Sequence, residues 1–387
     1  MTPIRCIFAL ILGCIASHIK AQTSIDSLLQ VITANNLELK ALTHEHDARF
    51  QELHTENTMN GPSVEYSPFY TKGYHGMASS ELIVSQEFDF PTQYAQRRQQ
   101  INLEGHALEG EYEARRREIV LEARLLIYDI IQQNQLIELL DERLAQGERV
   151  TTLIQKRMDA GDANILELNK ARLEQMQTAQ ERTTQLNTRQ ELLTQLQLLN
   201  AGHALKVDLL SLPEVETSIS SDEYETRLPE VEAAQKALNA SQHNEKLASQ
   251  SWLPTISVGY RRNTDEKVKL NGFLLGASFP LFSTSSRVKA ARERTQSNQL
   301  RLEMAQQEAQ LTQKQRYEEL QRLQTLLDHS DTQLLRETLD LIQKAMKEGQ
   351  ISSLQYYTEC EEIYNQLFNH IILHCSYVKT HASLYMR

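Results

Sequence analysis

The segment Ile154-Gln-Lys-Arg-Met-Asp-Ala-Gly161 decides the fold, because the chain carries it twice. Its second copy, Ile342-Gln-Lys-Ala-Met-Lys-Glu-Gly349, is identical at five of eight positions and lies 188 residues further on. Leu166 and Leu354 match at the same shift. Self-similarity at a fixed spacing indicates a duplicated structural unit.

Further matches at spacings of 191 or 192 residues support the duplication: Pro62 with Pro254, Phe88 with Phe279, and Leu37-Glu-Leu39 with Pro229-Glu-Val231. We expect a first repeat over residues 22–202 and a second over residues 203–387. Each repeat should contain a helix, a strand hairpin and a long helical hairpin, with its turn near Gly161 or Gly349.

Two long stretches, residues 92–212 and 281–387, contain no proline and so permit very long helices. At roughly 1.5 Å per residue, a helix over residues 92–158 would be about 100 Å long, far beyond a globular domain. Its apolar residues recur in steps of four and three, which favours coiled-coil packing. These residues are Ile119, Ala123, Leu126, Ile130, Ile137, Leu140 and Leu144.

Two short regions, about 63–90 and about 256–281, alternate instead with a period of two, as strand hairpins do. One face is aromatic and aliphatic, and the other carries Glu, Asp, Ser, Gly and Arg. A half-buried soluble sheet is one interpretation, but a barrel with lipid outside and water inside requires this contrast. The positions expected to face lipid are Val64, Tyr66, Leu82, Val84, Phe88, Ile256, Val258, Phe273 and Phe279.

The composition excludes other classes. The formal net charge of −11 argues against nucleic-acid binding, and a mean hydropathy of −0.48 without a long apolar run argues against membrane-spanning helices.

Four strands cannot close a barrel, and open strand edges in lipid cost several kcal/mol for each unpaired backbone group. Three copies would supply twelve strands. The expected fold is therefore mainly α, with long coiled-coil helices forming an α-barrel and four strands per chain contributing to a trimeric β-barrel.

The N-terminus has the features of a secretion signal over residues 1–21: a basic residue, a short apolar core and Ala21 before the cut. Lipidation at Cys14 is the alternative. Cys360 and Cys375 would remain after cleavage. On one helix they would lie about 22 Å apart, too far for a disulfide.

The chain resembles the TolC-like outer-membrane efflux family. Three segments carry the resemblance: Trp252-Leu-Pro-Thr-Ile-Ser-Val258, Gly276-Ala-Ser-Phe-Pro-Leu-Phe282, and Ile165-Leu-Glu-Leu-Asn-Lys-Ala-Arg172 after Gly161. The resemblance implies a homotrimeric passive exit duct of a tripartite efflux system. Its barrel would lie in the outer membrane of a Gram-negative bacterium and its helices in the periplasm. A periplasmic adaptor and an inner-membrane pump would be its partners.

The resemblance also implies which residues meet the adaptor and which narrow the entrance. Glu348 stands where the family often has a small apolar residue, and Gln355 and Thr358 stand where well-known members have aspartates. The implied docking residues are Arg157, Gly161, Asp162, Ala163, Gly349, Gln350, Ile351 and Ser352. The candidate gate residues are Gln355, Thr358, Glu359 and Glu362, and a plain solvated helix face is the alternative for the glutamates.

No catalytic motif is found, and we expect neither an enzyme nor a cofactor. His370 and His374 share a helical face, but two ligands make a poor metal site. A real site there would suit the heavy-metal branch of the family, which Gln86–Phe90 resembles weakly. The net negative charge predicts a duct that favours cations. The alternative function is a soluble periplasmic coiled-coil scaffold or adaptor.

Overall fold

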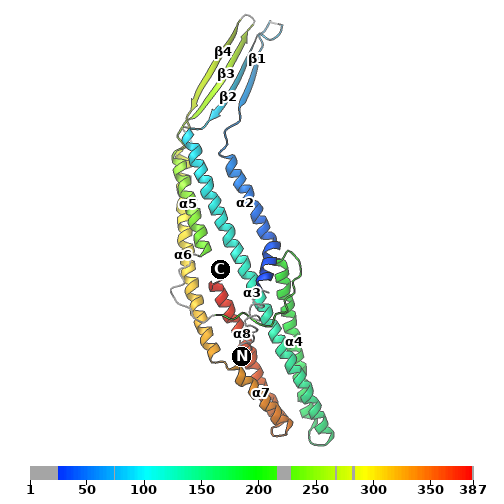
Figure 1. Ribbon diagram of the computed structural model, residues 1–387. Helices are drawn as coiled ribbons and strands as arrows, with labels where there is room; N and C mark the ends of the chain where they lie inside the picture. The colour runs from blue at the N-terminus through cyan, green and yellow to red at the C-terminus, as the bar shows by residue number, and fades with distance from the viewer. Residues whose placement is uncertain (1–24, 74, 216–227, 266–267, 281–283, 386–387) are drawn as a thin grey trace, which may run out of the picture. The chain divides into compact units, whose positions relative to one another are not determined.

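The computed structural model describes residues 25–73, 75–215, 228–265, 268–280 and 284–385. The expected leader, residues 1–21 with Cys14, lies outside the described residues. Residues 25–35 form a first helical segment. The elements that follow are α2 (Leu37–Thr55), β1 (Ser63–Phe69), β2 (Ser79–Phe88), α3 (Pro91–Asp159), α4 (Ile165–Leu199), α5 (Pro229–Ser249), β3 (Thr255–Asp265), β4 (Lys269–Ser278), α6 (Thr284–Asp328), α7 (Thr332–Lys347) and α8 (Ser353–Tyr385) (Figure 1).

The fold class expected from the sequence is confirmed: long helices dominate, and both strand hairpins form where the period-two patterns lie. The proline-free stretch after residue 92 yields α3, a single helix of 69 residues. The proline-free stretch after residue 281 does not yield one helix before its tip. It breaks after Asp328, and Asp331 caps the new helix α7 by accepting from the Leu334 N–H at 2.9 Å. Absence of proline therefore permitted, but did not ensure, a continuous rod.

The four strands form one antiparallel sheet in the order β1-β2-β3-β4. The two hairpins of the two repeats meet at the β2–β3 pair, where Val84 lies opposite Tyr260. Strands β1 and β4 are the edges of this sheet. None of the helices in the described ranges is long and apolar enough for a bilayer crossing.

The register gives the sheet two contrasting faces. One, the apolar face, carries Val64, Tyr66, Leu82, Val84, Phe88, Ile256, Val258, Tyr260, Phe273 and Leu275. The other, the polar face, carries Ser63, Glu65, Ser67, Glu81, Ser85, Glu87, Ser257, Gly259, Arg261 and Gly276, and on it Arg261 is paired with Glu81. The apolar face is not a hidden core, since Phe273 is 91% exposed and Leu275 is 80% exposed.

The chain divides into two compact units, each of which contains parts of both sequence repeats. Unit 1 comprises residues 1–40, 115–226 and 310–387, and unit 2 comprises residues 41–114 and 227–309. Unit 2 contains the whole sheet, and unit 1 contains both helical turns near Gly161 and Gly349.

Unit 1 contains two hydrophobic cores. The first surrounds Tyr128 of α3 and Cys375 of α8, both fully buried, and includes Leu196 of α4 and Leu320 of α6. The second lies nearer the helical turns and joins α3, α4, α7 and α8. Apolar area removed from water stabilises a fold by about 25 cal/mol per Å². These two cores are therefore the main source of stability for the long helices.

In unit 2, small residues let α5 pack closely on the early parts of α3 and α6. A Cβ on Gly110 would lie only 3.2 Å from the Ala233 Cα, so the backbones of α3 and α5 nearly touch there. Polar contacts fix the alignment: His243 Nδ1 lies 3.0 Å from Gln100 Oε1, and Thr295 Oγ1 donates to the Ser241 carbonyl at 3.1 Å. Burial lowers the pKa of His243.

Candidate docking site at the helical tips

The two helical turns have the same backbone structure, which the duplication predicted. After α3, the Asp162 N–H bonds to the Arg157 carbonyl and the Gly161 N–H to the Met158 carbonyl. After α7, the Gln350 N–H bonds to the Ala345 carbonyl and the Gly349 N–H to the Met346 carbonyl. This pair of bonds defines the Schellman motif, and every bonded position in it recurs 188 residues later.

Glycine is needed at both turns because the backbone there is left-handed. The φ angle is +83° at Gly161 and +74° at Gly349. A residue with a Cβ is strained in this region, whereas glycine is not. The repeated glycines therefore close the two hairpins and expose the residues that follow them.

The returning helices also begin alike. The Asn164 side chain caps α4 by accepting from the Leu166 and Glu167 N–H groups at 2.9 and 3.1 Å. Ser352, its equivalent 188 residues later, accepts from the Gln355 N–H at 3.2 Å before α8. Short polar caps of this kind typically stabilise a helix by about 1 kcal/mol.

One shared core holds the two tips together within unit 1. It buries Ile154 of α3, Leu168 of α4, Met346 of α7 and Tyr356 of α8. Beside this core, Ser353 Oγ donates to Glu167 Oε2 at 2.6 Å, which links the start of α8 to the start of α4. Figure 1 shows the α3–α4 and α7–α8 turns at the same end of unit 1.

The implied docking residues differ in exposure. Five of them are exposed: Gly161, Asp162, Gly349, Gln350 and Ser352. Ala163 and Ile351, equivalent in the two repeats, are half-buried and pack against the shared core, and Arg157 is half-buried as well. Two further apolar residues at the tips, Leu166 and Leu354, are 74% and 66% exposed. The tip surface is thus formed by matching residues from both repeats.

The candidate gate residues share one exposed face of α8. Gln355, Thr358, Glu359 and Glu362 are all exposed, and Glu362 accepts from Gln366 Nε2 at 3.1 Å. The opposite face of α8 contributes Tyr356, Tyr357, Cys360 and Tyr364 to the shared core. A helix with one buried and one solvated face has this pattern, so a gating role for the exposed face stays a prediction.

A buried ionic group above the tips was not predicted from the sequence. Glu174 of α4 is 8% exposed and lies between Arg143 of α3, at 3.6 Å, and Lys170. The Arg143 guanidinium also lies 5.1 Å from the ring centroid of Tyr364. Arg143, Glu174 and Tyr364 line a cavity of about 30 Å³ together with Tyr357 and Cys360. The sequence shows each residue but not which helices meet.

Burial controls the ionisation of this core. It raises the pKa of Cys360 to about 11 and that of Tyr364 to about 12. Burial also raises the pKa of the Cys375 thiol in the other core, to about 12. Thiolate is the reactive form of cysteine, so both thiols are protonated and unreactive near neutral pH.

The two candidate metal ligands have other roles in the structure. His370 Nδ1 lies 2.8 Å from Ser330 Oγ at the α6–α7 break, and the His370 and His374 rings stack 6.2 Å apart. Burial lowers the pKa of both. In the part of the chain that the structure describes, no three His, Cys, Asp or Glu side chains are grouped as metal ligands.

Residues 221–385 match the family model of outer membrane efflux proteins. No curated protein sequence matches the chain significantly. The resemblance predicted from the sequence is thereby confirmed for residues 221–385.

Solved structures extend the likeness to almost the whole chain. The structure of the channel CusC is 18% identical, covers 93% of this chain and 91% of its own, and superposes with a TM-score of 0.75. The CmeC outer membrane channel of Campylobacter jejuni is 14% identical over 94% of this chain and 84% of its own, with a TM-score of 0.77. The outer membrane protein VceC of Vibrio cholerae is 13% identical over 94% of this chain and 95% of its own, with a TM-score of 0.76. At these identities the likeness establishes the fold.

Alanine substitutions at the two tip glycines test whether the turns require a left-handed backbone at these positions. We expect Gly161→Ala and Gly349→Ala each to lower the free energy of unfolding by about 1 kcal/mol, because a Cβ is strained at positive φ. No atom lies within 4 Å of either added Cβ, so steric clash does not contribute. Gly61→Ala is the control, since its surroundings are equally open and its φ is not positive. Urea unfolding in detergent, followed by helical circular dichroism, measures the difference. Equal losses in all three variants would contradict this account.

Two arginine substitutions test the buried ionic group. Arg143→Ala leaves Glu174 with only Lys170, and we expect it to lower the free energy of unfolding by about 2 kcal/mol. Arg182→Ala, the matched control, removes an exposed pair with Asp141 between the same two helices and should cost less than about 1 kcal/mol. The same urea titration compares them. A larger loss for Arg182→Ala would show that the buried group is not important for joining the helices.

Proposed function

We propose that the chain is the passive exit duct of a tripartite efflux system in the outer membrane, with its helices in the periplasm. The observation that carries the proposal is the sheet: it has one exposed apolar face, one polar face and two free edges, β1 and β4. A soluble domain covers such an apolar face, whereas lipid is its natural solvent.

The same sheet supports a trimer. A strand edge in lipid must pair, because each unsatisfied backbone group costs several kcal/mol there. Edge β4 of one copy can pair with edge β1 of the next, and three copies close twelve strands around a water-filled interior. Exposed Leu300 and Met304 on α6 supply apolar surface for a neighbouring copy at the helical level.

We propose that the adaptor meets the exposed tip residues around Gly161 and Gly349, including Leu166 and Leu354. Two observations support this assignment: the two tips carry the same turns and caps, and both expose a leucine at the start of the returning helix. Exposed apolar side chains beside polar ones are typical of a surface that binds another protein. Ala163 and Ile351 would then shape the tips from within. The proposal assigns no role in catalysis.

Substitutions of two leucines on opposite faces of the sheet test whether the apolar face inserts into the membrane. Leu275 lies on the apolar face, and its neighbour Leu274 lies on the polar face. We expect Leu275→Asp to reduce the outer-membrane trimer severely, because the charge must enter lipid, while Leu274→Asp assembles. Heat-modifiable migration of detergent-extracted outer membranes measures the trimer. Equal assembly of both variants, or release of the unmodified protein with the soluble periplasm, would favour the scaffold alternative instead.

Cysteine cross-linking tests the adaptor contact. The native Cys360 and Cys375 are buried with raised pKa values, so an introduced surface thiol reacts selectively. We expect Asp162→Cys and Gln350→Cys to cross-link to the co-expressed adaptor in cells. Asp340→Cys, exposed on α7 but away from the tips, is the control. Cross-linking of Asp340→Cys alone would place the adaptor elsewhere.

A further inference from the structure

Three arginines recur every seven residues along the early part of α6: Arg287, Arg294 and Arg301. All three are exposed. A spacing of seven residues brings side chains to nearly the same helix face, about 10 Å apart along the axis. We call these three residues the arginine row.

The arginine row lines a continuous groove within unit 2. Arg287 and Arg294 line a cavity of about 500 Å³, and Arg294 and Arg301 line one of about 360 Å³. The two cavities share Arg294, Asn244 and Ala291, so they adjoin. Helices α3 and α5, the ends of β3 and β4, and the segments next to them form the rest of the groove.

The guanidinium groups of the row have no partner among the residues that the structure describes: none of the three makes a hydrogen bond or ion pair there. Other arginines of unit 2 do: Arg292 on α6 pairs with Glu245, and Arg97 on α3 pairs with Asp89 at 2.6 Å.

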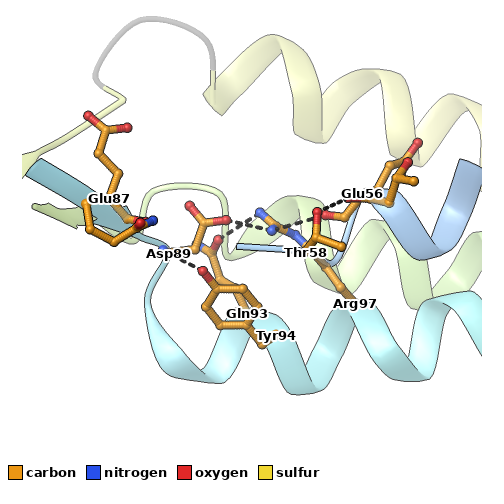
Figure 2. A network of polar contacts seen from close by, with 9 residues as sticks. Glu56, Thr58, Glu87, Asp89, Gln93, Tyr94 and Arg97 are labelled. Atoms are coloured by element: carbon orange, nitrogen blue, oxygen red, sulfur yellow. Dashed lines mark hydrogen bonds and ion pairs between the residues drawn. The ribbon is translucent and has the colours of Figure 1, made fainter. Parts of the chain in front are cut away.

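Figure 2 shows how fully Arg97 is engaged. It contacts Asp89, Gln93 and the Glu56 carbonyl, while the Asp89 N–H donates to the Tyr94 hydroxyl. This network fixes the turn from β2 into α3. The Asp89 carboxylate is therefore already occupied and does not neutralise the row.

The groove opens on the same side as the polar face of the sheet. Its larger cavity is also lined by Asp89, Thr255 and Ser278. Thr255 and Ser278 are paired across β3 and β4 and lie in phase with Ser257 and Gly276 of the polar face. In the proposed duct the polar face surrounds water, so the row would face that water.

The charge of the groove is positive although the chain is acidic. Its lining carries four arginines, the row and Arg97, against two carboxylates, Asp89 and Glu104. Asp89 is paired with Arg97, whereas Glu104 accepts, among the described residues, only from the neutral Gln100 amide at 2.6 Å and keeps its charge, so the lining has two net positive charges (four minus two). Fixed like charges in a confined space raise the local concentration of the opposite ion.

We propose that the arginine row is a binding site for organic anions that carry carboxylate or phosphate groups. A guanidinium presents a planar fork of N–H donors that matches either group with two parallel hydrogen bonds. The three forks, about 10 Å apart, offer successive sites along the path. This inference rests on the proposed function for the source of the anion, and it reverses locally the cation preference expected from the net charge.

Citrate binding tests the site directly, and conductance tests it in the open duct. Isothermal titration calorimetry on the detergent-solubilised protein at low salt should detect citrate binding. The triple variant Arg287→Gln, Arg294→Gln, Arg301→Gln should weaken it by on the order of tenfold. In planar bilayers with a KCl gradient, the same variant should shift the reversal potential toward cation selectivity.

A matched variant controls for lost charge. Arg98→Gln, Lys246→Gln, Lys289→Gln removes three exposed positive charges from α3, α5 and α6, and none of these residues lines the groove. We expect this variant to bind citrate within about twofold of the unmodified protein, because direct contacts outweigh screened distant charges. If the triple row variant fails to assemble, Arg294→Gln, which lines both cavities, replaces it.

The outcomes are distinct. Failure of the unmodified protein to bind citrate, or equal weakening in row and control variants, overturns the site and leaves the duct intact. If citrate binding depends on the arginine row but the protein shows no conductance in planar bilayers, the result supports the site and counts against the duct. Loss of the trimer in the row variants, with citrate binding unchanged, assigns the row to contacts between subunits and overturns the proposal.

Discussion

The backbone edges of the four-stranded sheet constrain everything else in this molecule. Strands β1 and β4 end the sheet with N–H and C=O groups directed away from it. In water these groups would be solvated, but the exposed apolar face beside them favours lipid. Lipid solvates apolar side chains and leaves backbone groups unsatisfied. In the proposed duct, pairing between copies meets both demands, so the proposal makes the subunit incomplete alone and requires its helices to fit neighbouring copies.

The helical hairpins impose a second constraint: the chain must reverse its direction at the end of a long helix. Each copy solves it with a left-handed glycine, a Schellman motif and a polar cap on the returning helix. These are local devices, encoded within about ten residues, and they recur 188 positions apart. Where the two hairpins meet, the repeats differ. Ser353 bonds to Glu167, whereas the equivalent positions in the opposite repeats are Ile165 and Gln355. The turns are therefore common to both repeats, whereas the contact that joins them is not.

The features that sequence analysis predicted are those encoded locally. Period-two alternation located both hairpins, lack of proline and length located α3, and the repeated octapeptide located both tips. The features it missed depend on which helices meet. The group of Arg143, Glu174 and Lys170 combines α3 and α4 at a register that no local pattern reveals. The break after Asp328 was missed because it involves no proline, although Asp331 then caps the start of the new helix α7. The half-burial of Ala163 and Ile351 likewise depends on the shared core.

The arginine row shows why net charge is a poor guide to the interior of such a molecule. Charges that are paired, such as Arg97 with Asp89, contribute little to the field that a passing solute experiences. Charges without an oppositely charged partner contribute most, and among the described residues of the groove these are the three arginines of α6 and the single carboxylate of Glu104. An exposed guanidinium is easily satisfied by water, so leaving it unpaired costs little stability in the separate subunit. Acidic residues elsewhere differ in the same way: Glu174 is ion-paired, and Glu362 lies on a solvated helix face. In the proposed duct, the field along the path therefore depends on side chains of both signs that are unpaired in the part of the chain that the structure describes: the arginine row in the groove, and Glu65 and Glu87 on the polar face of the sheet.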